Sequence, residues 1–154
     1  MRSFLRFLVV PVLACAAGCG SGGPPSSPTQ PTTGPPPFDL TGKWSGTATD
    51  SSGPGQMTWQ VTQQSGVMFS GTLTMTDTTA RVTGTGTVSG SVSSSSVSFS
   101  LAIPAGGFGG TYASCTVSAS GTAQASSSQL TGTYAGSNSC TGAITSGQFT
   151  LSKQ

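Results

Sequence analysis

The chain has 154 residues, enough for one domain, and only 5% of them are charged. Glu and His are absent, so no Ser-His-Asp or Cys-His arrangement can form, and we expect no enzymatic activity, no cofactor and no metal site. Beyond residue 18, three basic and three acidic side chains balance, which leaves no electrostatic basis for binding nucleic acid.

The first 18 residues have the features of a secretory signal peptide. Arg2 and Arg6 supply a positively charged start, and an apolar run from Phe4 continues to Ala14. This run is shorter than the about 20 apolar residues that a transmembrane helix needs. We therefore expect the segment to be cleaved after export.

Two cysteines follow the apolar run. Residues 16–19, with the sequence Ala-Ala-Gly-Cys, resemble the lipobox of bacterial lipoproteins. The resemblance implies a diacylglyceryl thioether on Cys19, cleavage just before it, and acylation of the new amino terminus, for example with palmitate. Residues 12–15 fit the pattern loosely and keep Cys15 as an alternative lipid site. An ordinary signal peptide with incidental cysteines is the other interpretation.

Residues 19–37 are predicted to form a tether that begins at the lipidated cysteine. Seven of residues 20–37 are Pro, and Gly, Ser and Thr supply most of the others, a composition typical of an extended spacer. A proline-rich ligand for a protein partner is the alternative. In Gram-negative lipoproteins, an Asp after the cysteine resembles an inner-membrane retention signal. Gly20 occupies that place, so the resemblance implies the outer membrane of the cell envelope.

Residues 38–154 alternate apolar or Gly positions with Thr and Ser, a pattern that predicts an all-β domain. The expected strands cover residues 40–49, 57–62, 67–75, 82–92, 97–103, 113–121, 130–134 and 147–151, with Ile144 beyond a bulge in the last one. Connections of hairpin length favour an eight-stranded antiparallel up-and-down β-barrel, with a β-sandwich as the alternative. The apolar face must be buried, which argues against a transmembrane barrel.

Two points of the sequence carry a resemblance to a family of barrels. Gly42-Lys43-Trp44 begins the first expected strand, and Lys153 ends the last one. This combination resembles the calycins, the lipocalin and avidin group of up-and-down barrels. The resemblance implies that Trp44 closes one end of the barrel and that Lys153 stacks over its ring. The residues that hold biotin in avidins have no match in this sequence.

Cys115 and Cys140 remain in the mature chain. Export to an oxidising compartment favours a disulfide between them. The sequence places Cys115 on the sixth expected strand and Cys140 between the seventh and the eighth.

The expected barrel is compatible with two functions. With a cavity it would bind an apolar or amphipathic small molecule, lined by Trp59, Phe69, Phe99 and Tyr134 and covered by Phe108. With a filled interior it would be a structural or surface-interaction protein of the envelope. The glycine-rich segment 104–110 around Phe108 is interpreted either as a lid or as a flexible connector.

Three carboxylates complete the candidate chemistry. Asp39 stands at the end of the tether, and Asp50 and Asp77 stand in expected turns. Asp in a turn commonly accepts hydrogen bonds from nearby backbone amides, so we expect Asp50 and Asp77 to be local turn residues.

Overall fold

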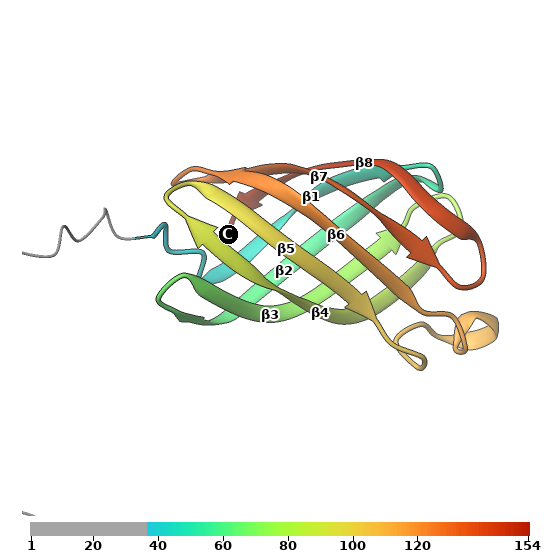
Figure 1. Ribbon diagram of the computed structural model, residues 1–154. Coiled ribbons are helices and arrows are strands. Elements are labelled where there is room, and N and C mark those ends of the chain that lie inside the picture. Colours follow the sequence, from blue (N-terminus) through green and yellow to red (C-terminus); the bar gives the residue numbers. More distant parts are fainter. Residues whose placement is uncertain (1–36) are drawn as a thin grey trace, which may run out of the picture. The chain divides into compact units, whose positions relative to one another are not determined.

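The computed structural model describes residues 37–154, so the predicted signal peptide, Cys15, Cys19 and nearly all of the tether lie outside the described residues. The strands are β1 (Gly42–Asp50), β2 (Gly53–Ser65), β3 (Met68–Asp77), β4 (Val82–Ser93), β5 (Ser96–Ile103), β6 (Val117–Ala125), β7 (Gln129–Asn138) and β8 (Gly142–Lys153). Each strand pairs antiparallel with the next, and β8 pairs with β1 (Figure 1). This closed barrel confirms the predicted fold and excludes the sandwich.

The alternation of the sequence becomes the inside and the outside of the barrel. In β5, Val97, Phe99, Leu101 and Ile103 are buried, and the residues between them are exposed. The same division holds around the barrel, where burial of the apolar face supplies the main stabilisation. Among residues 37–154, no helix is long and apolar enough to cross a membrane.

Glycines on the inner face let the strands approach and bend. At Gly90 a Cβ atom would collide with the carbonyl oxygen of Ser98 on β5, and at Gly121 it would collide with that of Thr133 on β7. These contacts explain why the inward rows contain Gly where an apolar side chain would otherwise be favoured. Such positions allow the sheet to coil tightly enough to close with eight strands.

Two irregularities interrupt the register. Between Tyr134 and Gly136 of β7, the pairing with β8 shifts, which confirms the bulge expected near Ile144. A second shift, between Val61 and Gln63 of β2, was not predicted. The second shift lies at the start of a run of polar residues, 62–65, in which apolar and polar residues do not alternate.

The beginning of the sixth strand was predicted wrongly. Alternation favoured a strand from residue 113, but β6 begins at Val117, and Cys115 belongs to the preceding loop. A short 3₁₀ helix, Gly110–Tyr112, precedes it, and the Cys115 amide donates to the Tyr112 carbonyl at 2.9 Å. These local hydrogen bonds hold the chain in turns, so it cannot pair as a strand there.

One end of the barrel is closed by the segment that leads into β1. Leu40 is fully buried there, and its carbonyl accepts a 2.7 Å hydrogen bond from Nε1 of Trp44. Nζ of Lys153 lies 5.2 Å from the centroid of the Trp44 ring, the contact that the calycin resemblance implies. Leu40 was expected inside the first strand, but β1 begins at Gly42, and Leu40 plugs the barrel instead.

The middle of the barrel is filled by aromatic rings. The Trp59 ring centroid lies 5.0 Å from that of Phe99, 5.3 Å from that of Phe149 and 6.4 Å from that of Phe69. Within the described residues, Nε1 of Trp59 is the one buried side-chain nitrogen or oxygen without a hydrogen-bond partner. The centre of the barrel is therefore a packed core, and a cavity lies nearer one end.

Candidate ligand-binding site

A cavity of about 190 Å³ opens at the end of the barrel opposite Trp44. We call this end the mouth. The ends of β1, β3, β5 and β7 meet there with the beginnings of β2, β4, β6 and β8. Most of the cavity wall is apolar and includes Ala48, Met75, Ile103, Val117 and Ile144. Such a wall suits the apolar part of a small ligand.

The loop between β5 and β6 lies at the mouth end of the barrel (Figure 1), and its residues Phe108, Tyr112 and Cys115 line the cavity, so we call it the cover of the mouth. Its Phe108 forms an isolated bridge with Gly84 of β4, and the Thr85 amide donates to the Gly107 carbonyl at 2.9 Å. A Cβ atom at Gly84 would collide with the Phe108 ring. Because Gly84 has no side chain, the Phe108 ring can pack against its backbone. Phe108 lines the cavity and is half-buried.

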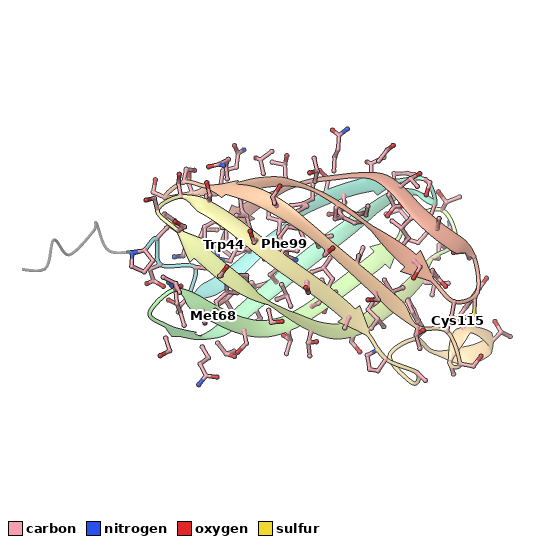
Figure 2. All side chains as sticks on the ribbon, in the orientation of Figure 1. Trp44, Met68, Phe99 and Cys115 are labelled. Atoms are coloured by element: carbon pink, nitrogen blue, oxygen red, sulfur yellow. A yellow bond between two sulfur atoms is a disulfide. The ribbon has the colours of Figure 1, made fainter. Side chains whose placement is uncertain are left out.

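A disulfide between Cys115 and Cys140 holds this loop to the β7–β8 turn, as predicted. The two Cα atoms are 5.6 Å apart, and Cys115 lines the cavity. Figure 2 shows Cys115 at the opposite end of the barrel from Met68. The cross-link therefore ties the cover of the mouth to its rim.

The hydroxyl of Tyr134 points to the carboxylate of Asp50. It donates a 2.7 Å hydrogen bond to Oδ2 of Asp50, while Oδ1 of Asp50 accepts from the Ser52 amide at 2.7 Å. Burial and this hydrogen bond raise the pKa of Tyr134 well above its ordinary value. Tyr134 therefore remains a neutral hydrogen-bond donor to Asp50, and both residues line the cavity.

The other two carboxylates are fixed by their own turns. Oδ1 of Asp77 accepts from the amides of Thr79 and Ala80 at 2.7 and 2.8 Å, and Asp77 also lines the cavity. At the closed end, hydrogen bonds from the Thr41 hydroxyl and amide lower the pKa of Asp39. The expected turn bonds are therefore present at Asp50 and Asp77, and the fold brings both carboxylates to the cavity.

The structure divides the predicted ligand-lining residues into two groups. Phe108 and Tyr134 line the cavity at the mouth. Trp59, Phe69 and Phe99 belong to the aromatic cluster in the middle and are not part of the cavity wall.

Sequence reasoning missed the pairing of Asp50 with Tyr134. The two residues are 84 positions apart, and no local pattern relates them. It also missed Phe149 in the aromatic cluster. Phe149 lies on the inner row of β8 that alternation identifies, so the signal was present, but the sequence does not show which inward rings meet.

The donor atoms near the cavity do not form a metal site. Within residues 37–154, no group of three or more His, Cys, Asp or Glu side chains is placed to hold a metal ion. Metal sites built from carboxylates alone use more oxygen ligands than Asp50 and Asp77 can supply. The cavity wall offers a ligand apolar contacts, aromatic rings and carboxylate oxygens.

Comparisons with known proteins place the chain among closed eight-stranded barrels. No family model matches the sequence, and the comparison with curated proteins finds no match. Solved structures of similar fold include two barrels with bound DFHBI. EF1p2_mFAP2b bound to DFHBI has 18% identity over 75% of this chain and 94% of its own, with a TM-score of 0.56. The redesigned β-barrel mFAP1 bound to DFHBI has 22% identity over 74% of this chain and 94% of its own, with a TM-score of 0.52.

Proposed function

We propose that this chain is a lipid-anchored protein of the bacterial envelope whose barrel binds a small apolar or amphipathic molecule at its mouth. The observation that carries the binding function is the cavity of about 190 Å³ with its largely apolar wall. Cavities near 150 Å³ with apolar walls accept a molecule the size of benzene. Drug-sized ligands occupy about 300–1,000 Å³, so the proposed ligand is smaller, with one ring or a short alkyl chain.

Two further features support a binding function. The similar barrels mFAP1 and EF1p2_mFAP2b were solved with the small molecule DFHBI bound, so this architecture accommodates ligands in other proteins. In this chain, the disulfide and the packing of Phe108 against Gly84 hold the cover of the mouth in place. A preorganised wall reduces the entropy lost on binding. The proposed function is binding alone and includes no catalytic step.

The proposed anchor is the acylated Cys19, followed by the proline-rich tether, in the outer membrane. Its support is the sequence pattern of residues 1–37, and the barrel adds one compatible feature. The chain enters the barrel at the closed end, where the Phe38 amide donates to the Ser94 carbonyl at 3.1 Å. The proposed tether therefore joins the barrel at the end opposite the mouth.

Native mass spectrometry of the full chain purified from cells tests the binding function. We expect a bound small molecule that dissociates on activation. Val117→Phe fills the cavity from β6 and should abolish the added mass. Its neighbour Ser118 faces outward, so Ser118→Phe is the matched control and should retain the ligand. Thermal unfolding verifies that both variants fold. Equal occupancy in the two folded variants would exclude the mouth as the site.

A further inference from the structure

Charged side chains are divided between the two ends of the barrel. Lys43 is the second residue of β1 and Lys153 ends β8, so both lysines belong to the closed end, where Asp39 also lies. Asp50 and Asp77 stand at the mouth and are the only charged residues on the cavity wall. Arg81, the remaining base among the described residues, is exposed in the β3–β4 turn. It therefore lies on the rim of the mouth, between the wall residues Ala80 and Val82, but is not itself part of the wall. The cavity therefore combines apolar walls with negative charge.

Both carboxylates are held at the cavity by neutral donors. Asp50 accepts from the Tyr134 hydroxyl and the Ser52 amide, and Asp77 accepts from two turn amides. These bonds orient the oxygens but do not cancel their charge. A ligand that enters the mouth therefore meets two carboxylates beside an apolar wall, against the single positive charge of Arg81 on the rim, and an anionic ligand would be disfavoured.

Aromatic rings add a second preference for positive charge. Phe108, Tyr112 and Tyr134 line the same cavity. An organic ammonium group attracts both carboxylates and the faces of aromatic rings, and a single ring or short chain attached to it suits the apolar wall. Two carboxylates are too few for a metal ion, so the chemistry favours an organic cation.

We propose that the mouth selects small organic cations, namely an ammonium group carrying one apolar ring or a short alkyl chain. In this arrangement Asp50 and Asp77 receive the ammonium group, and the apolar wall beneath Phe108 receives the ring or chain. The inference rests on the proposed binding function and specifies its ligand class. It predicts that affinity falls as ionic strength rises, because the charges lie at an open mouth.

Titration calorimetry of the full chain with three probes of one size tests the proposal. The probes are benzylamine, which is cationic at neutral pH, neutral benzyl alcohol and anionic benzoate. We expect benzylamine to bind about tenfold more tightly than benzyl alcohol, and benzoate to bind more weakly than either. Asp77→Asn keeps the acceptor oxygen for its turn and should remove most of the preference for the amine. Asp50→Asn should act in the same direction.

The matched control is Asp39→Asn, which removes the same charge from the closed end. It should leave the preference for benzylamine unchanged. Equal affinity for the amine and the alcohol, unaffected by Asp77→Asn, would overturn the selectivity for cations but leave binding at the mouth in place. If none of the probes binds and no ligand co-purifies, both the proposed binding function and this inference fail.

Discussion

At the scale of single residues, the two tryptophans show how one side chain can have opposite effects on stability. Both indoles are fully buried, but Nε1 of Trp44 has an acceptor in the Leu40 carbonyl, whereas Nε1 of Trp59 has no partner in the described part of the chain. A buried donor without an acceptor costs about 1–3 kcal/mol. The packing of Trp59 against three phenylalanines compensates for that cost.

Replacing each tryptophan by phenylalanine separates these contributions. Both changes remove the same volume, so the cavity costs are similar. Trp44→Phe also leaves the Leu40 carbonyl without its donor, whereas Trp59→Phe removes an unpartnered donor. We expect Trp44→Phe to lower the free energy of unfolding by about 2 kcal/mol more than Trp59→Phe. Urea unfolding of the two variants measures the difference. A larger loss for Trp59→Phe would show that its N–H has an acceptor in solution.

At the scale of elements, alternation predicted the strands well because nearly every strand has one buried and one exposed face. β5 follows the pattern at every position. The bulge in β8 was visible because Ile144 and Gly147 fall out of phase with one another. The shift at Thr62 was invisible because the rest of the strand after it, Gln63 to Ser65, is polar and does not alternate. Turns that imitate alternation, such as the segment before Val117, cannot be recognised without their hydrogen bonds.

The candidate site was less predictable than the strands that build it. Phe108 and Tyr134 were identified as inward or covering rings from local sequence. The contact of Asp50 with Tyr134 depends on closure of the barrel, which brings together residues from β1 and β7. The cavity itself depends on how far the aromatic cluster fills the interior. That is a property of three-dimensional packing, and a count of large and small inward residues does not determine it.

The disulfide is the element that should matter most for the cover of the mouth. Replacing both Cys115 and Cys140 by Ala opens a link across 25 residues and should lower the free energy of unfolding by about 3 kcal/mol. It should also make segment 104–116 sensitive to proteolysis while the barrel remains folded. Urea unfolding and limited proteolysis measure the two effects.

Reduction provides the control for this double variant. Dithiothreitol should reproduce both effects in the wild-type chain and should leave the double variant unchanged. If the urea midpoints of wild type and variant coincide, the loop is held by its hydrogen bonds and by the packing of Phe108 alone.

At the scale of the whole molecule, the two ends of the barrel have different chemistry. The closed end carries Trp44 under Lys153 and the entry of the chain. The mouth carries the cavity, its two carboxylates and the disulfide-linked cover. The outer wall between them is rich in exposed Thr and Ser, which suits water and not a bilayer core. The proposed tether and the proposed binding site therefore lie at opposite ends of the barrel.

The proposed anchor depends on one sulfur atom. Each methylene of a buried acyl chain contributes about 0.8 kcal/mol, so several chains together hold a protein firmly on a membrane. The balanced charges beyond residue 18 offer no polybasic attraction to replace those chains. Cys19→Ser should therefore move the protein from the membrane fraction to the soluble fraction, and intact-mass measurement should show loss of the acyl groups. Cys15→Ser is the matched control and should leave the protein in the membrane. The opposite pattern would assign the lipid to Cys15, and retention of both variants would mean that acylation at neither cysteine anchors the chain.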